Sequence, residues 1–308
     1  MASLSDRVVG IGEVCLHQIG AAPRSRESVV ELTRFSAQAG GAVGTALATV
    51  CAFGAQARYF GRLSDDEFAA MILKGLRDFG VDTSFVLTEP ERTSPVSFTL
   101  VDEVNARRLV RFTRGNLSEI EPGELPRGLL DGAGLLLIDG RSPAAQAAAA
   151  ERARSLSMPI VLDARHLGPG MGELLGLCDV VIGSERFAAE IAHSSDIGRC
   201  LIELTKMGPR IAVVTLGEEG AVGLEGEKMV RQGAIEVDVQ DTSGASDVFR
   251  GAFAYALVQG WPLERSLPFA NAAAGLDCRH LGGLAGIPSL AEVLRTAGLE
   301  PAPTPAAS

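Results

Sequence analysis

Short β-rich runs alternate with helix-forming runs along most of this chain, and that alternation limits the fold more than any other feature. Clear strand-like runs lie at 135–138, 160–163 and 211–215, and Ala/Leu-rich helical runs lie at 144–156 and 246–259. Strands that alternate with helices favour a parallel sheet covered by helices on both faces. We therefore expect an α/β fold with a doubly wound, mostly parallel sheet.

The first third of the chain does not follow this alternation of strands and helices. Apolar and polar residues alternate at about 17–36 and 93–115, which is typical of strands with one exposed face. These segments predict a small β-sheet lid inserted into a single domain over residues 1–299, with Val29 to Phe35 as one of its strands. The Pro/Ala-rich residues 300–308 are predicted to form a disordered tail.

Composition and charge exclude several classes of protein. The 308 residues carry a net charge of −10 and no basic run, so we expect no nucleic-acid partner. The five cysteines form no CxxC pair, which is typical of core thiols in a reducing compartment. No secretory leader or stretch of membrane-spanning length is evident. We therefore expect a cytoplasmic protein without a membrane partner.

The segment from Asp241 to Phe253 carries the clearest chemical signal. The small residues Ser243 to Ser246 lead directly into an apolar helix, and such a helix start aims free backbone N–H groups at one point. An anion would bind there, and Asp247 in the first turn could act as a base toward a hydroxyl. The alternative is an ordinary helix N-cap in which Ser243 or Asp247 satisfies the backbone donors.

The sequence DTSGASDVFRGAF at 241–253 resembles the second signature of PfkB (ribokinase-like) carbohydrate kinases, D-T-x-G-A-G-D-x-F-x-G-A-F. One position differs, because Ser246 stands where the family has glycine. The resemblance extends over about residues 8–295 in the family's order. Its further matching segments are Gly40-Gly41, 61–68, 76–82, 215–220, 271–274 and 282–288. Several motifs in the right order are more specific than any one of them.

The resemblance implies a ribokinase-like fold, ATP as donor, Mg²⁺ on the phosphates and, commonly in the family, K⁺ near the anion site. It implies that Asp247 is the base and that Gly244, Ala245 and Ser246 form the anion hole. The residues that it implies for binding the nucleotide are Thr215, Gly217, Gly220, Thr242, Asn271 and Ala273. The residues that it implies for binding the acceptor are His17, Glu27, Gly40, Gly41, Thr45 and Arg141.

Three departures from the family pattern concern substrates and metal. His17 stands where the family has an aspartate that binds two sugar hydroxyls; it could bind hydroxyls or be an ordinary strand residue at the lid hinge. Thr45 replaces an asparagine. Ser184-Glu-Arg-Phe187 replaces the N-x-x-E motif that organises magnesium-bound water, so Glu185 or Glu190 could substitute.

The fourth departure, Ser246, costs little if its φ is negative and is strained if its φ is positive. Thr45, Ser184 and the segment Ile138-Asp-Gly-Arg141 resemble the branch of ketohexokinases and sulfofructose kinases, whose arginine faces the acceptor pocket. Arg141 could therefore grip a hydroxyl, carboxylate or sulfonate, or be part of a surface ion pair.

These features predict an ATP-dependent carbohydrate kinase that phosphorylates a primary hydroxyl of a ketose-like sugar or sugar acid. One alternative is a sugar- or nucleotide-binding protein with impaired catalysis. Another is a nucleoside kinase on the same fold, in which Phe35, Phe98 or Phe112 would stack on the base. The alternating lid strands also predict a homodimer formed through the lid.

Overall fold

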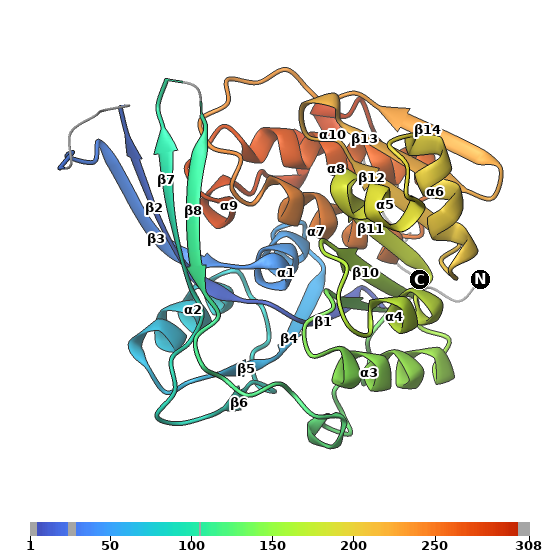
Figure 1. Cartoon of the computed structure of the whole chain (residues 1–308), viewed down its shortest axis with the longest axis horizontal. Coiled ribbons are helices and arrows are strands. Elements are labelled where there is room, and N and C mark those ends of the chain that lie inside the picture. Colours follow the sequence, from blue (N-terminus) through green and yellow to red (C-terminus); the bar gives the residue numbers. More distant parts are fainter. Residues whose placement is uncertain (1–4, 24–28, 105, 301–308) are drawn as a thin grey trace, which may run out of the picture.

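The computed structural model describes residues 5–23, 29–104 and 106–300. Its central sheet has the strand order β14-β13-β12-β11-β10-β9-β1-β4 (Figure 1). The bounds are β1 Arg7–Ile11, β4 Gln56–Phe60, β9 Leu135–Ile138, β10 Ile160–Ala164, β11 Val180–Ser184, β12 Ile211–Thr215, β13 Ala221–Glu225 and β14 Lys228–Gln232. All pairs from β4 to β12 are parallel, and β13 and β14 continue the sheet antiparallel. The predicted doubly wound, mostly parallel sheet is confirmed.

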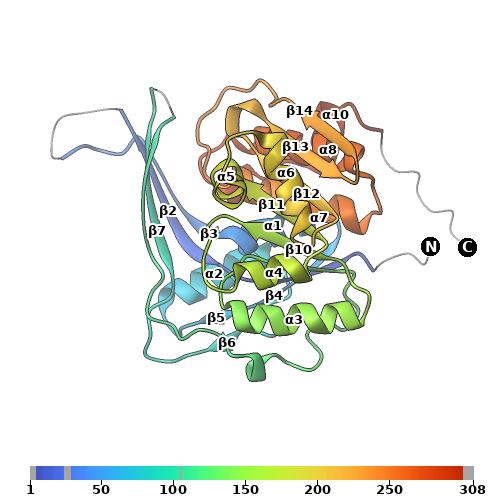
Figure 2. The ribbon, with the colours of Figure 1, turned by 45° about the vertical axis from the view of Figure 1, so that its right-hand side comes forward.

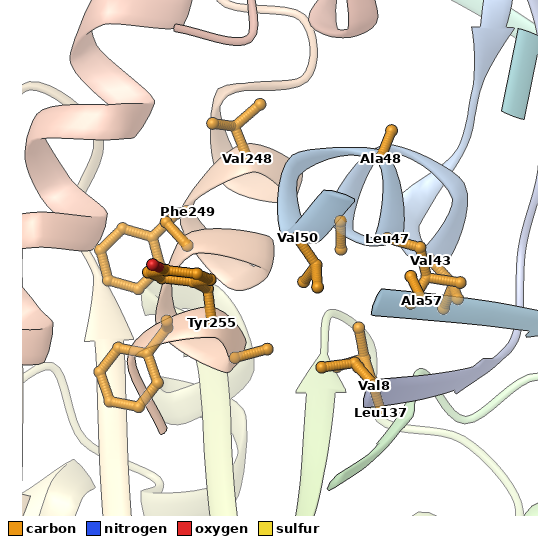
Figure 3. Close-up of a cluster of buried hydrophobic side chains, with 14 of the residues drawn as sticks. Val8, Val43, Leu47, Ala48, Val50, Ala57, Leu137, Val248, Phe249 and Tyr255 are labelled. Atoms are coloured by element: carbon orange, nitrogen blue, oxygen red, sulfur yellow. The ribbon is translucent and has the colours of Figure 1, made fainter. Parts of the chain in front are cut away.

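Helices on both faces of this sheet bury two hydrophobic cores. One core includes side chains of α1 (Ala42–Ala52), α2 (Glu67–Asp78), α7 (Ala245–Val258), α8 (Leu263–Asp277) and α10 (Leu290–Thr296). The other includes side chains of α3 (Pro143–Ser155), α4 (Met171–Leu177), α5 (Glu185–Ala192) and α6 (Ile197–Lys206). Figure 3 shows part of the first core, where Leu47 of α1, Val8 of β1 and Val248 of α7 belong to one apolar cluster.

Capping residues set where several of these helices begin. The Asp66 carboxylate accepts a hydrogen bond from the N–H of Ala69 (2.8 Å) at the start of α2, and Gly80 follows that helix with a positive φ of 91°. Ser184 caps α5 in the same way by accepting from the N–H of Phe187 (3.2 Å). Helix α2 therefore begins at Glu67, directly after its cap Asp66.

A second sheet of four strands stands beside the carboxyl end of the central sheet (Figures 1 and 2). Its order is β3-β2-β7-β8, with β2 Cys15–Ala22, β3 Arg34–Gly40, β7 Val96–Asp102 and β8 Arg108–Thr113. Strands β7 and β8 pair antiparallel and lie within the segment 93–115, where lid strands were predicted. The remaining short elements are β5 Arg62–Leu63, β6 Leu87–Thr88, η1 Pro122–Glu124, η2 Gly217–Glu219 and α9 Gly283–Gly286.

The strand predicted over Val29 to Phe35 lies farther along the chain, at β3. That strand pairs antiparallel with β2 from Arg34, opposite Ala21, to Gly40, opposite Cys15. The apolar residues before it do not pair; instead, Leu32 packs so closely over Gly20 that a Cβ there would lie 2.7 Å from Leu32 Cδ1. The alternation at 29–35 was therefore misread, because part of it reflects packing across the face of β2.

The two faces of the lid differ in polarity. Ser97 and Thr99 of β7 face the central sheet, whereas Phe98 and Leu100, which alternate with them, are about half exposed on the other side. Strand register places Phe35 and Leu109 in the same row as Leu100. We call Phe35, Phe98, Leu100 and Leu109 the outer lid face.

All five cysteines lie among the described residues. All five cysteines are free, and four of them are buried. Among the residues that the structure describes, no helix is both long and apolar enough to cross a membrane. Residues 301–308, within the predicted tail, lie outside the described part of the chain.

Candidate active site

A cavity of about 650 Å³ opens where the carboxyl ends of the central strands meet the inner face of the lid. Its walls come from the turn between β1 and β2, the start of α1, the lid strands, the loops after β9 and β10, and the turn before α7. Ligands of open α/β sheets bind beyond the carboxyl ends of the strands. This cavity is therefore the candidate active site.

The turn before α7 forms one end of the cavity. Gly244, the N-cap residue of α7, has a φ of 88°, and a Cβ there would lie only 2.2 Å from the Cα of Gly283. Asp241 holds the turn, since Oδ1 accepts from the N–H of Ser243 (2.8 Å) and Oδ2 accepts from the N–H of Gly282 (2.9 Å). The first turn of α7, whose N–H groups have no partners within the helix, thus meets the cavity and can receive an anion.

Ser246 fits this turn without strain. It lies in the first turn of α7, outside the set of residues with positive φ, so the serine costs little compared with glycine. Its Oγ donates a long hydrogen bond of 3.5 Å to Asp247 Oδ1. The hydroxyl is exposed toward the cavity and can donate to a ligand.

Asp247 reaches the wall of the same cavity, beside a cation. Its Oδ1 is paired with Nη2 of Arg165, which follows β10. The Nε of Arg165 donates to Oδ2 of Asp163 (2.9 Å). Burial alone would lower the pKa of Arg165, but the charges of Asp163 and Asp247 outweigh it and raise that pKa. The guanidinium therefore stays charged between two carboxylates.

A second ion pair lies beneath Asp247. Arg250 of α7 pairs with Asp163, and each side chain is 2% exposed. Arg250 Nη1 also donates to the backbone oxygen of Ser246 (2.6 Å). This bond ties the ion pair to the turn at residues 242–246, which we call the anion turn. Burial lowers the pKa of Arg250, and the charge of Asp163 opposes this effect. We call Asp163, Arg165, Asp247 and Arg250 the charge network.

A further acid lies behind the turn, outside the cavity lining. Asp277 of α8 is fully buried, and neither of its carboxylate oxygens has a hydrogen-bond partner among the described residues. Its Oδ2 would lie 3.5 Å from a Cβ on Gly244. Burial, with the negative charges of Asp247 and Asp241, raises the pKa of Asp277 well above its usual range. An acid without a counter-charge thus lies next to the anion turn.

The opposite wall carries most of the predicted acceptor residues. Gly41 has a φ of 90°, and a Cβ there would lie 2.7 Å from the Cα of Val14, so this close approach of two backbone segments requires glycine. Glu27 lies outside the described residues. The predicted acceptor residues that line the cavity are His17, Gly40, Gly41, Thr45 and Arg141.

His17 is both a strand residue and a cavity residue. It lies on β2, and its Nε2 is 2.8 Å from Oγ1 of Thr99 on β7. Burial lowers the pKa of His17, which keeps the imidazole neutral near pH 7. A neutral ring can still donate or accept one hydrogen bond with an acceptor hydroxyl.

Arg141 forms its ion pair inside the cavity. It contacts Glu13, with Nε 3.0 Å from Oε2, and both side chains are 30% exposed. Asp139 fixes both partners, since its carboxylate accepts from the N–H of Glu13 (2.7 Å) and of Arg141 (2.9 Å). Burial raises the pKa of Asp139 although these hydrogen bonds oppose it. Arg141 therefore does form an ion pair, and this pair lies in the wall of the cavity.

Most residues predicted for the nucleotide lie outside this cavity, near the turn between β12 and β13. Thr215 ends β12, and Gly217 and Gly220 follow with positive φ. Asn271 of α8 donates from Nδ2 to the backbone oxygen of Gly233 (2.8 Å), and a Cβ on Gly220 would approach this same segment. These four predicted residues therefore belong to one region of the fold.

The other nucleotide predictions differ in exposure. Thr242 is exposed at the start of the anion turn. Ala273 is fully buried in the apolar core, so its side chain is not presented to a ligand. Glu190 pairs with Arg186 (3.0 Å) on an exposed part of α5, whereas Glu185 is exposed at the first residue of that helix, directly after β11.

The prediction from sequence missed several charged residues around the cavity, among them Glu13, Asp163, Arg165, Arg250 and Asp277. Arg250 carried a usable signal, because a lone arginine in the apolar run 248–258 must find a buried acid. Asp163 lies near the end of a buried strand and Arg165 directly follows that strand, at the edge where ligands bind. Glu13 and Asp277 gave no comparable signal, since their roles depend on contacts with distant segments.

The chain matches the pfkB family of carbohydrate kinases over residues 5–290. It belongs to this family. It is 26% identical to the 5-dehydro-2-deoxygluconokinase of Shouchella clausii (93% of this chain, 94% of that protein) and 26% identical to the ribokinase of Bacillus subtilis (88% and 91%). The structure of Arabidopsis thaliana ribokinase complexed with ribose and ATP superposes with a TM-score of 0.81 at 22% identity (96% and 100%).

This pfkB-family kinase is therefore an ATP-dependent carbohydrate kinase with a ribokinase-like fold, as predicted. None of the three proteins just named is a ketohexokinase or a sulfofructose kinase. Membership of that branch, and the roles of the individual site residues, stay predictions.

Proposed function

We propose that this kinase transfers the γ-phosphoryl group of ATP to a primary hydroxyl of a ketose-like sugar or sugar acid, with Asp247 as the base. The observation that carries the proposal is the position of Asp247 beside the turn Gly244–Ser246, in one cavity with the acceptor-side residues. The first turn of α7 would stabilise the phosphoryl oxygens. Asp247 would accept the proton of the attacking hydroxyl.

Mg²⁺ would bind mainly through the phosphates of ATP. Among the described residues, no group of three or more His, Cys, Asp or Glu side chains could hold a metal ion. Mg²⁺ commonly keeps several waters and uses one or two carboxylates together with substrate phosphates. Glu185, exposed at the carboxyl end of β11, supports this arrangement better than Glu190, which is paired with Arg186.

A monovalent cation such as K⁺ fits the group behind the anion turn. Asp277 is fully buried without a hydrogen-bond partner among the described residues, and such a carboxylate is neutralised by a proton or a cation. A cation there would add positive charge next to the turn that receives the phosphoryl group.

The acceptor side favours a sugar over a nucleoside. Of Phe35, Phe98 and Phe112, Phe112 alone lines the cavity, whereas the other two belong to the outer lid face. The neutral His17 and the Glu13–Arg141 pair offer hydrogen bonds suited to hydroxyl groups. An unstrained Ser246 removes one reason to expect impaired catalysis.

The proposal also includes a homodimer and a cytoplasmic setting. The outer lid face leaves four large apolar side chains at least half exposed, which favours a second lid as their cover. Five free cysteines suit a reducing compartment.

An ADP-release assay tests the proposed function. Purified protein is given Mg-ATP with ketoses, aldoses, sugar acids, sulfosugars and nucleosides, beside Asp247→Asn. We expect turnover with a ketose-like sugar or sugar acid that the substitution reduces by at least about 10³-fold, because base and charge are both lost. If the protein is folded and binds ATP but releases no ADP with any acceptor, the result would instead support a binding protein.

A further inference from the structure

Arg165 occupies the middle of the active-site edge. It directly follows β10, which lies between β9 and β1 on one side and β11 and β12 on the other. The acceptor-side residues Glu13 and Arg141 follow β1 and β9, whereas Thr215 ends β12 on the proposed nucleotide side. Arg165 therefore stands where a phosphoryl group would pass from one substrate to the other.

The charge network holds one side of this guanidinium and leaves the other available. Nε is bonded to Asp163, which the fully buried Arg250 fixes from beneath, and Arg250 is bonded in turn to Ser246 of the anion turn. Nη2 contacts Asp247 and is also 2.9 Å from Asp163 Oδ2, and the Arg165 side chain, which lines the cavity, is 34% exposed. The terminal nitrogens of the Arg165 guanidinium can therefore exchange partners while Asp163 holds Nε in place.

The contact with Arg165 occupies Oδ1 of Asp247, so this oxygen is engaged with a cation instead of being open to an acceptor hydroxyl. A γ-phosphate at the first turn of α7 would bring more negative charge within reach of the same guanidinium, and Arg binds phosphoryl oxygens strongly through its fork. Two other cations of the cavity are already engaged, since Arg141 pairs with Glu13 and Arg108 of the lid donates to Ser243 Oγ (3.4 Å).

We infer that Arg165 is a further catalytic residue, which pairs with Asp247 in this structure and turns the end of its guanidinium fork to the transferring phosphoryl group when ATP binds. The acceptor oxygen then bonds to the γ-phosphorus, its proton goes to the released Asp247, and the bond from that phosphorus to the bridging oxygen breaks as ADP leaves with the electron pair. Arg165 stays protonated throughout. This inference rests on the proposed function.

Two measurements on Arg165→Gln and Arg165→Lys test the inference. In steady-state kinetics we expect Arg165→Gln to lower kcat by roughly 10²- to 10³-fold, with the acceptor KM changed less than about threefold. Arg165→Lys should recover part of kcat, because it keeps the charge but not the fork. In calorimetric titrations with Mg²⁺, Arg165→Gln should bind ADP as the wild type does but bind the non-hydrolysable analogue AMP-PNP roughly tenfold more weakly.

The controls separate catalysis from folding and from acceptor binding. Arg141→Gln, on the acceptor side, should raise the acceptor KM and leave the ratio of ADP to AMP-PNP affinity unchanged. A kcat for Arg165→Gln within threefold of the wild type, or equal losses of affinity for ADP and AMP-PNP, would overturn the inference. If Arg165→Gln does not fold, Arg165→Lys answers the same question. If the wild type turns over no acceptor, the proposed function fails, whereas the nucleotide titrations still decide the role of Arg165.

Discussion

The charge network and the outer lid face differ in what surrounds their side chains. In the network, two acids and two arginines alternate from fully buried Arg250 to Asp247 at the cavity, so every charge has an opposite neighbour. On the outer lid face, apolar side chains are half exposed, and the described residues do not cover them. The network is therefore neutralised by its own members, whereas the proposed dimer would cover the lid with a second chain.

This difference predicts which property of the protein a substitution in each region should change. Removing one member of a buried ion pair leaves the other uncompensated in a low-dielectric interior. Removing an apolar group that is already half in water changes folding little. Network substitutions should therefore act on stability, and lid substitutions should act on association.

The largest effect should come from Arg250→Met. It leaves the buried Asp163 with one cationic partner fewer, so we expect a loss of about 3–5 kcal/mol in the free energy of unfolding. Urea denaturation measures it. The matched control is Arg231→Met, whose ion pair with Glu219 is more than 60% exposed on both sides, with an expected loss of about 0–1 kcal/mol. Similar losses in both variants would break the comparison.

A smaller, pH-dependent effect should come from Asp277→Asn. Because the folded state raises the pKa of Asp277 well above the unfolded value, its contribution is most favourable at acid pH and is lost as pH rises through the folded pKa. In buffers without K⁺, Asp277→Asn should therefore be more stable than the wild type near neutral pH, by about 1–3 kcal/mol. Urea titrations between pH 5 and 8 (about 0.1 M ionic strength) measure the slope. An identical slope in both proteins would contradict the uncompensated acid.

The smallest effect on folding should come from the double substitution Phe98→Ser and Leu109→Ser. Both side chains are about half exposed, so the free energy of unfolding of the subunit should change by less than about 1 kcal/mol. Sedimentation equilibrium should show the dimer weakened by at least about tenfold. Met229→Ser, equally exposed on β14, is the matched control and should leave association unchanged. A wild-type chain that is monomeric at all concentrations would refute the lid dimer.

Much of the fold could be predicted because its signals are local. Strands such as 135–138 and helices such as 144–156 can be recognised from the spacing of their apolar residues and from the glycine or proline residues near their ends. The misplaced strand at Val29 to Phe35 shows the limit. An alternating pattern does not reveal whether its apolar residues face a core or, like Leu32, pack over a glycine of a neighbouring strand.

The candidate site was predictable to the extent that a motif is continuous in sequence. The turn before α7 and Asp247 lie within a few residues of one another, and they occupy one end of the cavity. The partner of Asp247 could not be found in this way, because Arg165 reaches it from a different strand and 82 residues away in the chain. Arg250 was detectable as an isolated charge in an apolar helix, but the sequence did not reveal that Asp163 is its partner.

The contact between Gly244 and Gly283 has a genetic consequence. A Cβ on Gly244 would lie 2.2 Å from the Cα of Gly283, and a Cβ on Gly283 would lie 2.8 Å from the Cα of Gly244. Neither residue can become smaller to make room for a larger partner. A substitution at one position therefore has no suppressor at the other, and a selection for revertants should recover glycine itself or backbone changes in the surrounding loops.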